Sequence, residues 1–372
     1  MVGSMSETSR HRRKHLAIRL RRKHLAAHHH HHRRRKHLVI ALPVAIVVCV
    51  AVGVPIVLSM APSVSSPVHA STTSSVASTT SSVASTTSPP SAPAASSLGV
   101  YAGYENVSGV VEFSQLVHVP SAQAMDFFDG TSWNTIEESP SNIVPAWEGT
   151  PYRMTWSIPI LPSDGSTLAQ GAAGLFDHHF AVIAQYLVAQ NQGQSVIRLG
   201  WEFNGGWFPW SAGKCATCFV SYWQQIVTTM RAVPGAQFRF EWNPNIGAIQ
   251  LPPPRAYPGN DFVDIIGSDV YDNELGEHTP SERWNQLYSE PYGLKWLVDF
   301  AKAHSKPISL PEWGLGFAPA GGGDDPYFIK QMALFIGSQP DVDNALYWES
   351  GSSVLTRWPL SRAAYTRYFG AS

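Results

Sequence analysis

The chain has 372 residues, of which 44% are hydrophobic and 14% are charged, and its formal net charge is −1 at pH 7. The charge is unevenly distributed, because residues 1–38 contain 12 of the 26 Lys and Arg residues but a single acidic residue, Glu7, which leaves 14 basic against 26 acidic residues in the rest of the chain. That acidic excess excludes nucleic acid as a partner and argues against tight docking on anionic lipid, since both are bound through basic patches.

The first segment, residues 1–37, is a basic tail rich in histidine. The motif Arg-Arg-Lys-His-Leu occurs three times, ending at Leu16, Leu25 and Leu38, and a run of five histidines fills residues 28–32. We interpret the segment as a solvated cytoplasmic tail. The alternatives for the histidine run are a metal-binding tract and a cloning tag.

Residues 38–60 follow as the predicted membrane anchor. Residues 38–58 are 21 consecutive uncharged residues, long enough for a helix across a hydrocarbon core despite Pro43 and Pro55. The basic tail would stay in the cytoplasm, so that the rest of this single-pass protein of the cell membrane would be extracellular. The alternative is a cleaved signal and a secreted protein, but the apolar run exceeds the usual signal core of about 7–15 residues.

Residues 61–97 form a segment rich in Ser, Thr, Pro and Ala. The heptad Ser-Thr-Thr-Ser-Ser-Val-Ala occupies residues 71–77 and again residues 78–84. With so few apolar side chains the segment cannot bury a core. We therefore expect a disordered, extended stalk.

Residues 98–372 contain all 13 Trp residues and are long enough for one large domain. Apolar runs typical of buried strands alternate there with helical patterns. The predicted strands are residues 98–102, 124–128, 153–161, 195–202, 238–243, 263–271, 307–312 and 344–348. The predicted helices are residues 110–119, 171–190, 219–233, 292–304, 326–336 and 357–369. This alternation indicates an α/β fold, the (β/α)8 TIM barrel, in which functional side chains gather at the carboxyl ends of the strands.

Two of the predicted strands end in a glutamate among aromatic residues and glycines. Residues 197–210 read IRLGWEFNGGWFPW and contain Glu202, and residues 308–314 read ISLPEWG and contain Glu312. An ionised carboxylate beside indole rings is unfavourable unless it is paired, so such a glutamate suggests a raised pKa and a chemical role. Two of them, on the fourth and seventh strands, indicate glycoside hydrolysis, which needs one protonated and one ionised carboxyl group.

This pattern resembles glycoside hydrolase family 26, the β-mannanase family of the clan with catalytic glutamates on strands four and seven. The matching positions, in chain order, are Glu202, Asn204-Gly205, Trp207, Asp269-Val270-Tyr271, Glu312-Trp313-Gly314 and Tyr347-Trp348. One position departs from the family, whose mannanases generally have histidine immediately before the first glutamate, where this chain has Trp201. An indole has one donor and a broad apolar face, so we expect an altered substrate choice with plain mannan as a poor substrate.

The resemblance implies roles for particular side chains. Glu202 would be the acid/base and Glu312 the nucleophile of a retaining double displacement, with Tyr271 orienting the nucleophile. The substrate-binding residues would be Trp201, Asn204, Trp207, Trp210, Trp348 and Arg198. No cofactor is expected.

Other side chains with chemical potential have simpler interpretations. Cys215 and Cys218 are expected to form a disulfide rather than a redox centre or half a zinc site, since no second ligand pair completes four-coordination. His178-His179 lies in a helical pattern without a third ligand at suitable spacing, so we expect no metal. Glu241 also ends a predicted strand and is the alternative catalytic partner if the strand count is shifted by one.

The sequence therefore predicts a retaining, endo-acting glycoside hydrolase that cleaves a β-linked polysaccharide at the cell surface. The candidate substrates are a mannan-like polymer, a β-glucan, and a glycan of the envelope or exopolysaccharide. We expect a monomer. The alternative is a non-catalytic glycan-binding or wall-anchoring barrel, but the presence of both glutamates favours the enzyme, because buried carboxylates without a function cost stability.

Overall fold

Parallel β-strands form the centre of the computed structural model, which describes residues 92–372 apart from 248, 274–277, 317–320, 352, 371 and 372. The strands in these described residues are β1 (Leu98–Tyr101), β2 (Gln123–Phe127), β3 (Arg153–Ile158), β4 (Val196–Leu199), β5 (Arg239–Trp242), β6 (Ile265–Gly267), β7 (Val270–Asp272), β8 (Ile308–Leu315) and β9 (Val342–Trp348). Each predicted strand has a counterpart. The predicted strand 263–271 is divided into β6 and β7, and β4 ends before Glu202, which lies in the turn that follows.

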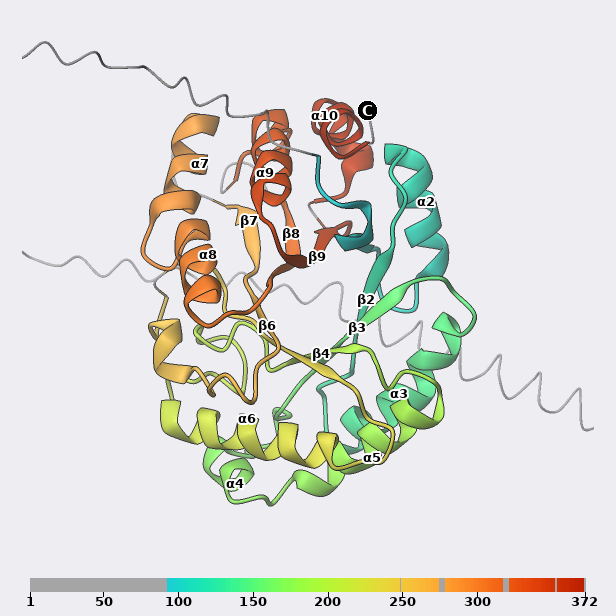
Figure 1. The fold of residues 1–372 in the computed structure, drawn as a ribbon, viewed down its shortest axis with the longest axis vertical. Coiled ribbons are helices and arrows are strands. Elements are labelled where there is room, and N and C mark those ends of the chain that lie inside the picture. The colour runs from blue at the N-terminus through green and yellow to red at the C-terminus, as the bar shows by residue number, and fades with distance from the viewer. Residues whose placement is uncertain (1–91, 248, 274–277, 317–320, 352, 371–372) are drawn as a thin grey trace, which may run out of the picture. The chain divides into compact units, whose positions relative to one another are not determined.

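The strands close into a barrel. Each of β1 to β5 pairs in parallel with the next strand, β6 pairs with β8, and β9 pairs with both β8 and β1. β6 and β7 together fill one strand position of the barrel, or stave. β6 pairs with the start of β8 at Ile308 and Ser309, whereas β7 pairs with the end of β8 from Trp313 to Leu315. The pairing gives eight staves around the axis, and the predicted TIM barrel is confirmed. Figure 1 shows the strands arranged around that axis.

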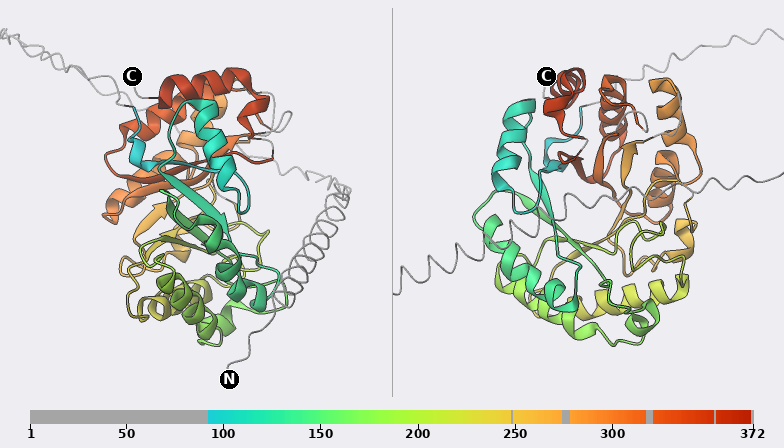
Figure 2. Two further views of the ribbon diagram at one scale, coloured as in Figure 1. Left: turned by 90° about the vertical axis from the view of Figure 1, so that its right-hand side faces the viewer. Right: turned by 180° about the vertical axis from the view of Figure 1, so that it is seen from behind.

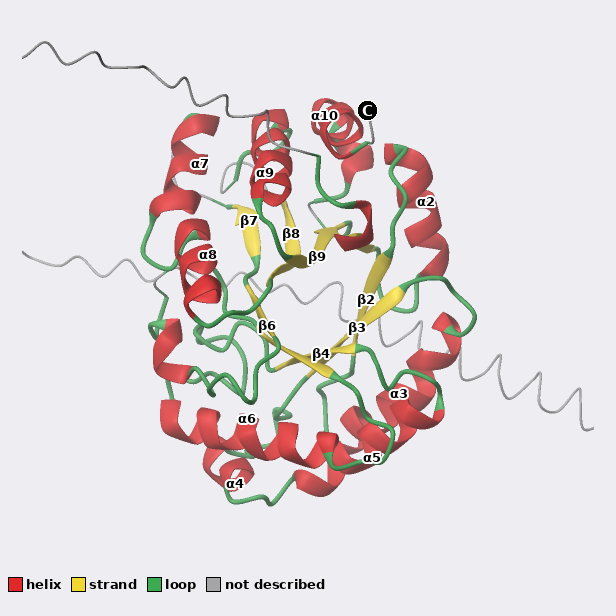
Figure 3. Ribbon diagram, in the orientation of Figure 1, coloured by secondary structure: helices red, strands yellow, loops and turns green. Residues whose placement is uncertain are grey.

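Helices surround the strands on the outside, as the colouring of Figure 3 makes clear. They are α2 (Val107–Val117), α3 (Trp133–Trp147), α4 (Leu168–Ala172), α5 (Asp177–Ala189), α6 (Ala216–Arg231), α7 (Pro280–Ser289), α8 (Leu294–Ala303), α9 (Pro326–Ser338) and α10 (Pro359–Phe369), with short 3-10 turns η1 (Ala95–Ser97), η2 (Pro253–Ala256) and η3 (Leu355–Arg357). The last helix, α10, packs beside α2 (Figure 2), where the ring centroids of Tyr365 and Phe113 are 5.4 Å apart.

Two helices, α3 and α7, were not among the predicted elements. α3 contains Pro140 and Pro145, which each remove a backbone donor and normally argue against a helix. Its capping box at Ser132 and its buried apolar face outweigh that loss. α7 begins with a capping box between Thr279 and Glu282, but it carries few apolar residues and so has a weak helical pattern.

The predicted tail and membrane span, residues 1–60, lie outside the described residues, and so does most of the predicted stalk. Within the part of the chain that the structure describes, no helix is both long and apolar enough to cross a membrane.

Candidate active site

The turn that follows β4 presents Glu202 at the carboxyl end of the barrel. Gly200 and Glu202 have φ of 45° and 51°, in the left-handed region, which costs a residue other than glycine about 1–3 kcal/mol. The Glu202 backbone N–H donates to the Asn243 carbonyl oxygen beyond the end of β5, at 2.8 Å. A strained backbone held by a neighbouring strand is typical of a functional side chain.

Two donors hold the carboxylate of Glu202. Trp207 donates its indole N–H to Oε2 at 2.7 Å, and Asn245 donates its side-chain amide to Oε1. Burial raises the pKa of Glu202, the nearby charge of Glu312 raises it further, and the bonds from Asn245 and Trp207 offset part of the rise. This carboxyl group is therefore shifted toward its protonated form, as a proton donor requires.

Glu312 lies on β8, the seventh stave, in a different environment. Arg198 donates from Nη1 to its Oε1 at 2.7 Å, and Tyr271 donates from Oη to its Oε2 at 2.8 Å. Burial and the charge of Glu312 raise the pKa of Tyr271 well above its usual range, so the phenol remains a donor. Each oxygen of Glu312 therefore has its own strong donor, a guanidinium on one side and a phenol on the other.

Arg198 on β4 is completely buried and joins several strands through one guanidinium group. Its Nη2 donates to Asp269 at 2.5 Å, its Nε donates to Asn243 at 2.5 Å, and Glu241 lies 3.7 Å from Nε. Burial alone would lower the pKa of Arg198, but Asp269, Glu312 and Glu241 outweigh it and raise the pKa. The group therefore stays charged. It holds Glu312 and does not itself reach a substrate, in contrast to its predicted binding role.

Glu241, the alternative catalytic partner, lies inside the barrel. Its side chain is fully inaccessible and accepts a hydrogen bond from Asn344 at 2.8 Å. Burial raises its pKa, and Arg198 lowers it in part. A substrate could not reach this carboxyl group, so Glu202 and Glu312 remain the pair at the barrel mouth.

Four of the predicted substrate-binding residues are tryptophans, and they differ in exposure. Trp207 is 51% exposed beside Glu202, and the half-buried Trp348 stacks on Tyr101 with ring centroids 4.3 Å apart. Trp210 is only 3% exposed and donates its indole N–H to the Trp201 carbonyl at 2.8 Å. Trp201 itself is 8% exposed. Trp210 therefore holds the backbone of Trp201 and is too buried to contact a sugar. Little of the Trp201 ring is accessible to a sugar.

Asn204 also differs from its predicted role. Its side chain is completely buried and makes two hydrogen bonds of 2.8 Å with the backbone of Asn245, one as donor to the carbonyl and one as acceptor from the N–H. Asn204 therefore positions Asn245 and does not contact a substrate. Sequence reasoning missed Asn245, although it follows β5 within the polar sequence Asn243-Pro244-Asn245 at a strand end.

The predicted disulfide is present in the structure. Cys215 and Cys218 are bonded at the start of α6, where the Cys215 sulfur also accepts a hydrogen bond from the Cys218 backbone N–H at 3.3 Å. The bond ties the N-cap of α6 to its first turn, at the end of the loop that contains Glu202 and the exposed Trp207.

Comparison with known proteins finds a similar family. The model for "Glycosyl hydrolase family 26" matches residues 167–305, a range that includes Glu202 and Tyr271. The predicted resemblance to glycoside hydrolase family 26 is confirmed. The middle of the chain is therefore similar to glycoside hydrolases of this family.

The relatives and solved structures agree with this family. A mannan endo-1,4-beta-mannosidase of Bifidobacterium adolescentis is 26% identical over 165 residues, and the match covers 40% of this chain but only 15% of that relative's length. The Bacillus subtilis mannanase man26 has 17% identity and a TM-score of 0.51, covering 73% of this chain and 85% of that one. A family 26 beta-mannanase from Bacteroides ovatus has 16% identity and a TM-score of 0.51, covering 74% and 86%. At these identities the solved structures support the fold alone.

We expect Arg198→Met to lower the free energy of unfolding by about 3–5 kcal/mol at neutral pH, because buried carboxylates lose their counter-charge. The pKa values of Asp269 and Glu241 are already raised by burial and would rise further. Groups with a raised folded-state pKa contribute stability in acid that is lost as the pH rises through that pKa. The deficit relative to wild type should therefore be smaller at about pH 4.5 than at about pH 7.

Urea unfolding at the two pH values measures this deficit. Arg231→Met is the matched control, because Arg231 is 36% exposed and pairs with the partly exposed Asp264; it should change stability by about 1 kcal/mol or less. If Arg198→Met lost the same free energy of unfolding at both pH values, the role of Arg198 as a counter-charge for the buried carboxylates would be contradicted.

Proposed function

We propose that the barrel cleaves a β-linked polysaccharide by a retaining double displacement, with Glu202 as the acid/base and Glu312 as the nucleophile. The observation that carries the proposal is the unequal environment of the two glutamates. Burial and a neighbouring negative charge raise the pKa of Glu202, whereas Glu312 is paired with a buried guanidinium and a phenol. That difference supports Glu202 as the proton donor and Glu312 as the nucleophile.

The reaction follows from these positions. Glu312 attacks the anomeric carbon while Glu202 protonates the departing glycosidic oxygen, and a covalent glycosyl ester forms on Glu312. Glu202, now ionised, then takes a proton from a water molecule that attacks the same carbon, and Glu312 is released. Tyr271 and Arg198 act as positioning residues, because they fix the orientation and charge of the nucleophile.

The aromatic side chains favour action within a polymer. Trp207 lies beside Glu202, and Trp348 lies near Tyr271, the partner of Glu312, with ring centroids 6.4 Å apart. Aromatic rings near both glutamates can pack against sugar rings on both sides of the cleaved bond. We therefore propose endo action by a protein that needs no cofactor.

The substrate class is proposed from the relatives and from Trp201. The relatives described above are mannan-degrading enzymes by name, so a mannan-like polymer is the first candidate. Trp201 replaces a polar contact by a packed indole, and a site that loses a polar contact discriminates less sharply at the hydroxyl concerned. We propose that a β-glucan or an envelope glycan is cleaved better than plain mannan.

Glycan-panel assays of the full-length, detergent-solubilised protein test the catalytic roles. Glu312→Ala should abolish turnover, and Glu202→Ala should slow polysaccharide cleavage by about 10²–10⁴-fold while sparing aryl glycosides with activated leaving groups. Azide should rescue Glu312→Ala and give a glycosyl azide of inverted configuration. Asp299→Asn, an exposed carboxylate on α8, is the control and should behave as wild type.

Several outcomes would contradict this assignment. Near-normal polysaccharide cleavage by Glu312→Ala would remove the proposed nucleophile. Glycan binding by the wild type without cleavage of any panel member would favour the non-catalytic barrel. Mannan as the best substrate would show that Trp201 does not alter substrate choice.

The pH dependence of cleavage tests the environment of Glu202. Asn245 stabilises the carboxylate form by donating a hydrogen bond, which lowers the pKa of Glu202. Asn245→Ala should therefore raise that pKa and move the alkaline limb of kcat/KM on the polysaccharide to higher pH. Asn260→Ala, which removes an exposed amide beside His304, should leave the profile unchanged. A downward shift for Asn245→Ala would refute this role of Asn245.

We also propose that the barrel is a monomer held outside the cell by residues 38–58. The support is the basic tail followed by 21 uncharged residues. Full-length protein should sediment with membranes, and an external protease should reach the barrel. Deletion of residues 38–58 should release the protein from membranes. A soluble mature form beginning near Ala61 or Ser71 would show instead that the segment is a cleaved signal.

A further inference from the structure

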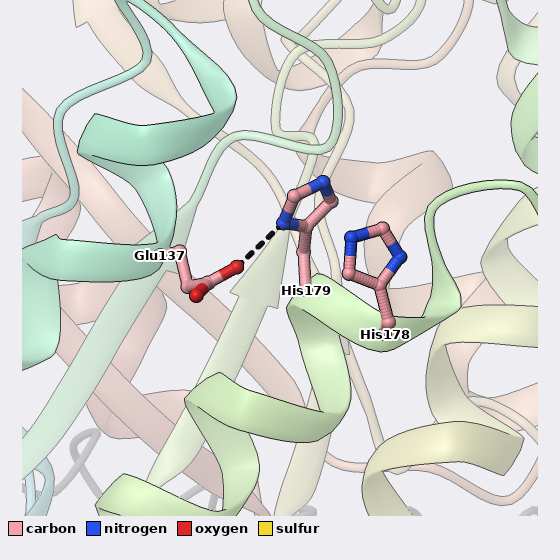
Figure 4. Close-up of side chains that lie close together, drawn as sticks. All are labelled: Glu137, His178 and His179. Atoms are coloured by element: carbon pink, nitrogen blue, oxygen red, sulfur yellow. Dashed lines mark hydrogen bonds and ion pairs between the residues drawn. The ribbon is translucent and has the colours of Figure 1, made fainter.

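A cluster of two histidines and one glutamate lies away from the glutamate pair, between two outer helices. Glu137 comes from α3, and His178 and His179 come from the first turn of α5. One ligand atom from each residue lies within 4.8 Å of the others, and Figure 4 shows His179 between its two neighbours. The third ligand that the sequence around His178 and His179 lacks is supplied by α3, 42 positions before His179.

The central histidine is held in place by contacts on two sides. His179 Nδ1 lies 2.6 Å from Glu137 Oε2. Its ring stacks on Trp133 with centroids 4.5 Å apart and planes 6° apart, and Phe176 stacks against Trp133 at 4.4 Å. The ring of His178 lies 3.8 Å from that of His179. These contacts fix His179 toward Glu137, whereas the exposed His178 is free to adjust.

The side chains of the cluster are of the kinds that bind transition metals. Neutral imidazole is the form that binds a metal. Glu137 contributes a negative charge, and Asp177 adds another at the first position of α5. Two imidazoles and one carboxylate are a ligand set that zinc accepts.

We propose that Glu137, His178 and His179 bind zinc or a similar divalent transition metal, which joins α3 to α5 on the outside of the barrel. The metal would replace the proton shared by His179 Nδ1 and Glu137 Oε2. Bonds of about 2.0–2.1 Å in a tetrahedral site place ligand atoms about 3.3 Å apart. The 2.6 Å pair must therefore open slightly, and rotation of the exposed His178 brings in the third ligand. Water fills the fourth position.

The test must separate this site from the histidine run in the tail. We would use the full chain in which each histidine of residues 28–32 is replaced by serine, and titrate it with ZnCl2 and with CoCl2. The expected result is one metal ion per chain, visible absorption of four-coordinate cobalt, and a rise in Tm of about 5 °C at saturating zinc that EDTA reverses.

Variants in the same background identify the ligands. His178→Ala removes an exposed ligand, and Glu137→Gln keeps a hydrogen-bond partner for His179 but removes the carboxylate, so both should fold. Each should weaken zinc binding by about tenfold or more and remove the rise in Tm. His118→Asn is the matched control, because His118 is exposed and has φ of 54°, which Asn tolerates.

The outcome is decisive in either direction. Loss of binding in both ligand variants, with normal binding by His118→Asn, supports the site. Absence of zinc binding by the parent, or unchanged affinity in His178→Ala and Glu137→Gln, would overturn it. Because the readout is binding and Tm, the result does not depend on whether the barrel cleaves a polysaccharide.

Discussion

The buried guanidinium of Arg198 is the interaction on which the candidate site depends. It contacts or closely approaches three carboxyl groups from three staves of the barrel, those of Glu241, Asp269 and Glu312. Without a permanent cation at this point, three acids in a dry interior would have to give up their charges. With it, the three carboxyl groups share one buried counter-charge, and Glu312 is the one of the three that is not completely inaccessible.

The second glutamate is controlled by different means. Glu202 receives neutral donors, an indole and an amide, and the charge with the largest effect on its pKa is the negative charge of Glu312. The amide belongs to Asn245, which Asn204 fixes through its backbone. One acid is therefore governed by an ion pair and the other by burial and two neutral hydrogen bonds. Two identical side chains therefore differ in their hydrogen-bond donors and in the charges beside them.

Much of the fold could be predicted from the sequence, because buried parallel strands appear as short apolar runs that alternate with helices. The same logic placed Glu202 and Glu312 at strand ends. The same reasoning did not predict α3, because its two prolines argue against a helix, whereas burial of its apolar face stabilises it in the folded protein. It also assigned Asn204 and Trp210 to the substrate, because their proximity to Glu202 in sequence says nothing about which way a side chain points. Asn245 and Glu137 escaped notice because their partners lie 43 and 42 positions away.

The break between β6 and β7 has a consequence for how the site is tuned. At the break, the Asp269 N–H donates to the Pro244 carbonyl and the Ile246 N–H donates to the Asp269 carbonyl. These hydrogen bonds attach the loop that carries Asn245 to the backbone between β6 and β7. The Asp269 side chain accepts a hydrogen bond from Arg198. The interruption between β6 and β7 therefore fixes Asn245, which donates to Glu202. It also fixes Asp269, which binds Arg198, the partner of Glu312. Small changes in the backbone between β6 and β7 could therefore change the pH at which a related barrel is active, even with both glutamates unchanged.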